Sequence, residues 1–128
     1  MKTALITGVT SGFGRAFAIR FAKLGYRLII TGRRKERLEE LAGQLRADYA
    51  TEVLTLCFDV RDNDACRLAI ESIGDSFSHV DILVNNAGLA AGATPFDEAD
   101  MGDFERMIDT NVKGLLYITK LIVPGMIA

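Results

Sequence analysis

Two kinds of hydrophobic pattern alternate along the chain. Short continuous apolar runs predict buried strands, and longer stretches with apolar residues three or four positions apart predict amphipathic helices. The predicted strands are residues 2–7, 28–30, 53–58 and 82–84. The predicted helices are residues 12–24, 34–47, 62–77 and about 103–122, with a loop at 89–101. This alternation predicts an α/β fold in which helices cover both faces of a parallel sheet.

Each predicted helix has its own set of apolar positions. The first carries Phe13, Phe17, Phe21 and Leu24 at helical spacing. The second has a stripe of Leu38, Leu41 and Leu45. The third is expected to be capped by Asp62 and to direct four side chains toward the core: Ala65, Leu68, Ala69 and Ile73. The apolar side of the last comprises Phe104, Met107, Ile108, Leu115, Ile118 and Ile122. Gly114 interrupts this last helix and favours a local distortion or close packing.

The order of the elements predicts where a ligand would bind. Right-handed crossovers give a doubly wound sheet with strand order 3-2-1-4 in a single domain, residues 1–128. Ligands of such sheets bind outside the carboxyl ends of the strands, near the point where the winding reverses. That point lies between the first and fourth strands, which end in a glycine-rich turn and in the segment 85–88.

Composition narrows the classes of function. The net charge of −2, without a basic stripe, argues against nucleic-acid binding, and no apolar run is long enough to span a membrane. Met1 to Thr3 lead directly into a strand, so we expect no signal peptide and a cytoplasmic protein. Cys57, Cys66 and His79 are not clustered, so no metal site is expected.

The glycine-rich turn is a candidate phosphate site. Residues 7–14 read Thr-Gly-Val-Thr-Ser-Gly-Phe-Gly and join a strand to a helix. Gly8 permits a tight turn, Gly12 lets the backbone approach a pyrophosphate, and Gly14 lets the helix pack close to the sheet. The N–H groups and dipole at the helix N-terminus would face the anion. An ordinary turn is the alternative interpretation.

Two arginines follow the second strand. Enzymes that prefer NAD usually carry an acidic residue here, which accepts from the ribose 2′-hydroxyl. Arg33 and Arg34 instead suit a 2′-phosphate, because a guanidinium pairs with a phosphate dianion and keeps its charge. We therefore expect NADP(H). In the alternative interpretation, Arg34 only begins a charged helix whose balancing acids are Glu36, Glu39 and Glu40.

Polar residues at two further strand ends are candidate ligands. Asp59 is placed to accept from an adenine amino group while Val60 flanks the ring; the alternative role, a helix cap, suits Asp62 better. The next strand ends in Asn85, Asn86, Ala87 and Gly88. The two amides need partners and could tie neighbouring strands together, and the two small residues would let a ribose lie against the backbone.

These motifs together resemble the short-chain dehydrogenase/reductase superfamily, in order and in spacing, over the whole chain. The resemblance implies a Rossmann fold and cofactor roles for Gly8, Val9, Thr10, Ser11, Gly12, Phe13, Arg33, Arg34, Asp59, Val60 and Asn86. Asn111, a poor helix former within the last helix, would orient a catalytic lysine, often through water. Segments 31–34, 81–89 and 107–111 are similar to the bacterial NADP-dependent 3-hydroxy acid (serine) dehydrogenases.

The resemblance also implies an activity and an assembly. It implies hydride transfer between a nicotinamide and a small hydroxy acid, alcohol or ketone, with a small molecule as substrate. The long helix resembles the family's oligomer-forming helix, which implies a homodimer or homotetramer; burial against its own sheet is the alternative. No nucleic-acid or membrane partner is expected.

The family's catalytic Ser and Tyr-x-x-x-Lys are not found. The tyrosines are Tyr26, Tyr49 and Tyr117, and none has a lysine four residues later. In the family these groups lie on the next strand and helix, so we expect a cofactor half, truncated before them and inactive alone. The alternatives are a non-catalytic nucleotide-binding module and an interaction fragment whose long helix docks on a partner.

Overall fold

A parallel sheet forms the centre of the molecule. The computed structural model describes residues 1–10, 12–88 and 95–128. Within them the strands are β1 (Thr3–Ile6), β2 (Arg27–Gly32), β3 (Val53–Cys57) and β4 (Ile82–Val84). They pair in the order β3-β2-β1-β4, and every pair is parallel. The predicted doubly wound sheet and its strand order are therefore confirmed.

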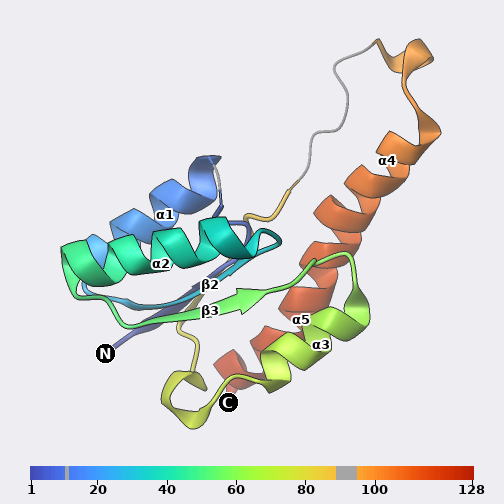
Figure 1. Ribbon diagram of the computed structural model, residues 1–128. Helices are drawn as coiled ribbons and strands as arrows, with labels where there is room; N and C mark the ends of the chain where they lie inside the picture. The colour runs from blue at the N-terminus through green and yellow to red at the C-terminus, as the bar shows by residue number, and fades with distance from the viewer. Residues whose placement is uncertain (11, 89–94) are drawn as a thin grey trace.

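Helices cover both faces of this sheet (Figure 1). The α-helices are α1 (Gly12–Lys23), α2 (Lys35–Tyr49), α3 (Asn63–Glu71), α4 (Met101–Ile108) and α5 (Leu115–Ile127). Helices α1 and α2 lie on one face, and α3 and α5 lie on the other. Shorter turns are η1 (Asp75–Phe77), η2 (Phe96–Glu98) and the π-helical segment η3 (Asp109–Gly114). The predicted loop 89–101 lies partly outside the described residues, and its last residue, Met101, already begins α4.

The alternation of side chains along the strands creates two cores. Leu28 and Ile30 of β2 face α1 and α2, whereas Ile29 between them faces α3 and α5. The leucine stripe predicted for α2 is buried in the first core. The second core contains Leu5, Ile29, Leu56, Val60, Cys66, Val80, Ile118 and Ile122.

The buried faces of α1 and α3 differ from those predicted. Helix α1 buries small residues, namely Gly14, Ala18 and Ala22, and three of its predicted apolar positions are exposed: Phe13, Phe17 and Leu24. Small residues occupy the buried face because they let the helix backbone approach the sheet closely. In the third predicted helix the fully buried residue is Cys66 and Leu68 is exposed, whereas Ala69 and Ile73 are partly buried against the second core, as predicted. This helix also ends at Glu71, before the extended Gly74, and not at residue 77.

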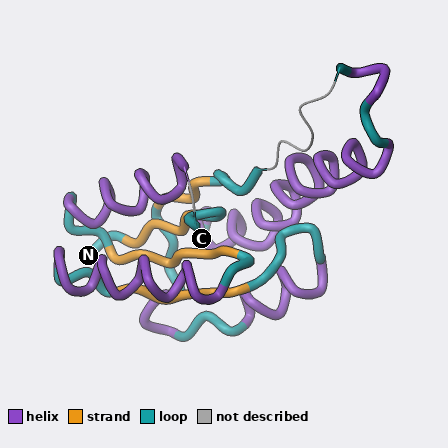
Figure 2. Tube along the Cα trace, turned by 45° about the horizontal axis from the view of Figure 1, so that its top comes forward, coloured by secondary structure: helices purple, strands orange, loops and turns teal. Residues whose placement is uncertain are grey.

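The last predicted helix is longer than expected and contains a π-helical segment. Helices α4 and α5 join through η3 into one rod that carries α4 beyond the sheet (Figure 2). Ile118 and Ile122 are buried as predicted, but Ile108 and Leu115 are exposed. A π turn adds residues to the helical repeat, so the apolar face of α4 is out of phase with that of α5.

Gly114 ends the π-helical segment at a point of close packing. It is buried, and a Cβ added there would lie 2.7 Å from Cγ2 and 3.1 Å from the carbonyl oxygen of Val60. The distortion and close packing predicted for this glycine are both present. The contact holds the chain that follows β3 against the long helix.

The contact predicts opposite effects for two helical Gly→Ala substitutions. Gly114→Ala is expected to lower the free energy of unfolding by about 1–3 kcal/mol, because the new methyl group overlaps Val60. Gly43→Ala in α2 is the control, since no heavy atom lies within 4 Å of the new Cβ. It is expected to raise the free energy of unfolding by up to about 1 kcal/mol, because Ala is the better helix former. Urea denaturation measures both, and equal effects would contradict the close contact.

Candidate functional site

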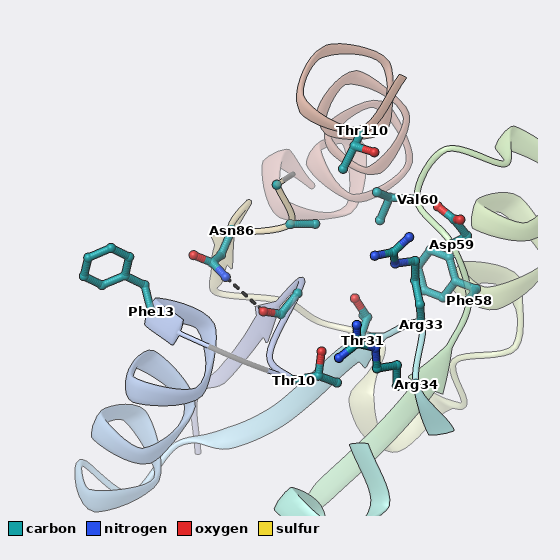
Figure 3. A pocket seen from close by; sticks show the side chains of 14 residues that line it. Thr10, Phe13, Thr31, Arg33, Arg34, Phe58, Asp59, Val60, Asn86 and Thr110 are labelled. Carbon is teal, nitrogen blue, oxygen red and sulfur yellow. Dashed lines mark hydrogen bonds between the residues drawn. The ribbon is translucent and has the colours of Figure 1, made fainter. Parts of the chain in front are cut away.

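A cavity of about 280 Å³ lies at the carboxyl ends of the strands (Figure 3). This is the edge of the sheet at which the winding predicts a ligand site. It is lined by residues from the end of β2, from segments that follow all four strands, from the first turn of α1 and from η3. They are Gly8, Thr10, Phe13, Thr31, Gly32, Arg33, Arg34, Phe58, Asp59, Val60, Asn86, Ala87, Gly88 and Thr110.

The glycine-rich turn forms one wall of the cavity through backbone packing. Gly8 has φ +67° and Gly12 has φ +59°, a region that glycine adopts without steric cost. A Cβ on Gly8 would lie 2.7 Å from Cα of Ala87, and one on Gly14 would collide with the carbonyl oxygen of Gly8 and the amide of Asn86. The turn after β1, the end of β4 and the start of α1 therefore meet without room for side chains.

The side chain of Thr7 joins the ends of β1 and β4. Its Oγ1 accepts hydrogen bonds from the backbone N–H groups of Asn86, at 3.0 Å, and Ala87, at 2.9 Å. The Asn86 Nδ2 donates to the carbonyl oxygen of Gly8 at 3.0 Å. The side-chain amide of Asn86 thus holds the glycine-rich turn in place, which is a structural role.

Asn85 has a different partner from the one predicted. Its Nδ2 donates to Oγ1 of Thr119 at 2.9 Å, and that hydroxyl donates to the carbonyl oxygen of Leu115 at 2.7 Å. The suggestion that it ties neighbouring strands together is therefore wrong, because it ties the end of β4 to α5. The difference arises because α5 packs over this strand end, which the sequence pattern alone does not reveal.

Arg33 and Arg34 enter the cavity from the end of β2. In Figure 3 the Arg33 guanidinium points toward Val60, and that of Arg34 points toward Thr10. Both side chains belong to exposed residues, and within the described ranges neither forms an ion pair with a carboxylate. Two cations are thus available to an anion in the cavity. Helix α2 begins only after Arg34, which has an extended backbone.

Asp59 lies at the end of β3 and pairs with Arg61. The Arg61 Nη2 is 2.7 Å from Oδ2 of Asp59, Nε is 3.0 Å from the same oxygen, and the Arg61 backbone N–H donates to Oδ1 at 3.0 Å. Burial alone would raise the pKa of Asp59, but the hydrogen bonds and charge of Arg61, with the charge of Arg33, hold that pKa below its usual value. Asp62 caps α3 through the N–H of Ala65, as predicted.

The remaining predicted residues occupy several positions around the cavity. Val9 is fully buried in the core and its N–H donates to the carbonyl oxygen of Thr31 at 3.1 Å. Phe13 is 79% exposed and its ring points away from the other labelled side chains (Figure 3). Ser11 lies outside the described residues. Asn111 lies on η3, with its Oδ1 3.4 Å from the position of a Cβ added to Gly88.

Several residues of the site belong to none of the sequence motifs. Thr31, Gly32 and Phe58 could have been found from their position at the carboxyl ends of predicted strands. Thr110 could not, because its place in the cavity depends on the π-helical segment. The sequence alone does not indicate whether Arg61 pairs with the carboxylate of Asp59 or with that of Asp62.

Metal binding and membrane insertion find no support in the described residues. No group of three or more His, Cys, Asp or Glu side chains in these ranges could hold a metal ion. Cys66 is buried, and burial, with the charges of Asp62 and Asp59, raises the pKa of its thiol to about 11, so it stays protonated. No helix of the described chain combines the length and the apolar character needed to cross a membrane.

Comparison with known proteins identifies the family. Residues 2–128 match the short chain dehydrogenase family. The chain is 47% identical over 126 residues to a probable NADP-dependent dehydrogenase of Haemophilus influenzae, and 48% identical over 125 residues to a serine 3-dehydrogenase of Agrobacterium fabrum. Each alignment covers 98% of this chain, but only 48% and 49% of the respective relative. The chain belongs to the short chain dehydrogenase family and spans about half the length of these relatives.

A solved structure of the same architecture agrees with this assignment. An alcohol dehydrogenase from the archaeon Thermococcus sibiricus, complexed with 5-hydroxy-NADP, superposes with a TM-score of 0.92 at 31% sequence identity. The match covers 98% of this chain and 53% of the archaeal one. The described fold therefore matches about half of that chain.

The hydroxyl of Thr7 is expected to be essential for joining the two strand ends. Thr7→Val removes the acceptor of two backbone N–H groups and is expected to cost about 2 kcal/mol of unfolding free energy. Thr7→Ser keeps the hydroxyl and is expected to cost about 1 kcal/mol, from the lost methyl group. Urea denaturation compares them. A Thr7→Val variant as stable as Thr7→Ser would contradict this role.

Proposed function

We propose that this member of the short chain dehydrogenase family binds NADP(H) in the cavity at the carboxyl ends of its strands. In the whole protein the bound cofactor would exchange a hydride with a small hydroxy acid, alcohol or ketone. The observation that carries the proposal is the pair of guanidinium groups of Arg33 and Arg34 beside the glycine-rich turn, neither of which forms an ion pair with a carboxylate of the described residues. The names of the relatives, NADP-dependent dehydrogenase and serine 3-dehydrogenase, support it.

The charges in the cavity fit the phosphate groups of this cofactor. Arg33 and Arg34 would hold the 2′-phosphate, since a guanidinium donates two parallel hydrogen bonds to a phosphate dianion. The backbone of the glycine-rich turn would hold the pyrophosphate at the N-terminus of α1, where N–H groups and the helix dipole favour an anion. The residues proposed for the turn are Gly8, Val9, Thr10, Ser11, Gly12 and Phe13. Among the described residues other than its chain neighbours, no heavy atom lies within 4 Å of a Cβ built on Gly12, so the space beside this glycine is open.

The other end of the cavity fits the base and the second ribose. Asp59 and Val60 would border the adenine, with the carboxylate as acceptor for the amino group. Asn86, Ala87 and Gly88 would border the ribose next to the nicotinamide, because their side chains are small or already turned toward the turn after β1. Asn111, beside Gly88, would orient a catalytic lysine of the whole protein.

The assembly of the whole protein is a second part of the proposal. The rod formed by α4, η3 and α5 exposes large apolar side chains, which are Met101, Ile108, Val112, Leu115, Leu116 and Ile127. Exposed apolar surface of this kind is typical of an interface between proteins. A homodimer or homotetramer through this rod would cover it.

A non-catalytic nucleotide-binding module is the second candidate function. It is favoured by the sequence of this chain, in which none of Tyr26, Tyr49 and Tyr117 has a lysine four residues later. The tyrosine and lysine pair that would supply the proton accompanying hydride transfer is therefore absent from these residues. The two candidates share the cofactor site and differ only in turnover.

The two arginines are expected to discriminate between the cofactors. Arg33→Ala and Arg34→Ala should each weaken NADPH binding about ten- to a hundredfold, because a charged hydrogen-bond partner of the 2′-phosphate is lost. NADH, which lacks this phosphate, should bind with unchanged affinity. Fluorescence titration with both cofactors measures the dissociation constants, and Arg20→Ala on the exposed side of α1 is the control. Equal losses for NADPH and NADH would exclude the 2′-phosphate role.

Binding and turnover are expected to separate in the 128-residue chain. It should bind NADPH but should not reduce NADP⁺ in the presence of serine or another 3-hydroxy acid, because the Tyr-x-x-x-Lys pair is absent from its residues. Absorbance of NADPH at its nicotinamide band measures turnover, and fluorescence titration measures binding. Turnover by this chain would contradict the need for that pair, and absent binding would contradict the cofactor site.

A further inference from the structure

An acidic and a basic side chain face the same part of the cavity from neighbouring strand ends. Arg33 follows β2, Asp59 follows β3, and both line the cavity (Figure 3). The charge of Arg33 lies near enough to contribute to the lowered pKa of Asp59. Charge-assisted hydrogen bonds between a guanidinium and a carboxylate are among the strongest in proteins, so Asp59 is a possible competitor for Arg33. Such a pair would withdraw Arg33 from any phosphate in the cavity.

A third residue already occupies the carboxylate. Arg61 reaches both oxygens of Asp59 through Nε, at 3.1 Å and 3.0 Å, and its Nη2 lies 2.7 Å from Oδ2. Its backbone N–H adds a bond to Oδ1 at 3.0 Å. The two residues are only two positions apart, and each side chain is about a third exposed, so the pair is local and partly screened from solvent.

The other charges around Arg61 leave it available for this role. Asp109, at the start of η3, is the second acid near the Arg61 guanidinium. Its carboxylate is already 3.2 Å from Nζ of Lys113. Asp62 is turned to the N-terminus of α3, where its Oδ1 accepts from the Ala65 N–H. Asp59 is therefore the acid that Arg61 neutralises by direct contact.

We infer that Arg61 is a positioning residue for cofactor selectivity: it holds the Asp59 carboxylate and so keeps Arg33 free for the 2′-phosphate of NADP(H). This inference rests on the proposed function. Arg61 itself need not touch the cofactor. Its effect on selectivity is exerted through the competition between a carboxylate and a phosphate for the same guanidinium.

The test is the ratio of the NADPH and NADH dissociation constants in purified protein. Arg61→Ala should weaken NADPH binding about five- to tenfold with NADH unchanged, because Arg33 turns to Asp59. Adding Asp59→Asn to Arg61→Ala should restore the ratio, since the competing charge is gone. Any direct effect of Asp59 on adenine cancels, because both cofactors carry the same base. Arg61→Lys, which keeps a cation beside Asp59, should lose less than Arg61→Ala.

Two further variants and the unsubstituted protein separate the possible failures. In an Arg33→Ala background, Arg61→Ala should not change the ratio any further. Arg67→Ala is the matched control, because Arg67 lies on α3 and pairs with Asp64 and Glu71. A ratio that Asp59→Asn does not restore would mean that Arg61 binds the phosphate itself, and equal losses for both cofactors would mean a structural role; either overturns the inference. Failure of the unsubstituted protein to prefer NADPH would instead overturn the proposed function.

Discussion

The close approach of three backbone segments at one edge of the sheet is the constraint on which the site depends. The turn after β1, the end of β4 and the first turn of α1 pack so tightly that Gly8 and Gly14 cannot carry a side chain. The Thr7 hydroxyl and the Asn86 amide supply the hydrogen bonds that fix this arrangement. Because these contacts use backbone atoms and small groups, the space beside them remains open as a cavity.

A second close contact sets the opposite wall. Gly114 packs closely against Val60, so the long helix holds the chain that follows β3 beside the cavity. The charged residues Arg33, Arg34 and Asp59 line the cavity between these walls, and none of them belongs to either hydrophobic core. Packing therefore determines where the cavity lies, and the charged side chains determine which kind of ligand it can bind.

The sequence was sufficient for the parts of the structure that follow from local pattern. Strand order, the positive φ of Gly8 and the cap at Asp62 each depend on residues close in sequence or on general rules of chain handedness. The buried face of α1 was not predictable from hydrophobicity, because close packing selects alanine over phenylalanine there. The partner of Asn85 depends on the tertiary arrangement, because Thr119 lies 34 positions away, and a residue-type argument leaves several acceptors equally acceptable.

The π-helical segment η3 has a consequence for the surface that the long helix presents. Because its wider turn shifts the helical phase, the faces of α4 and α5 are not continuations of one another. One uninterrupted rod therefore carries two surfaces that face different directions, joined at the turn that contributes Thr110 to the cavity.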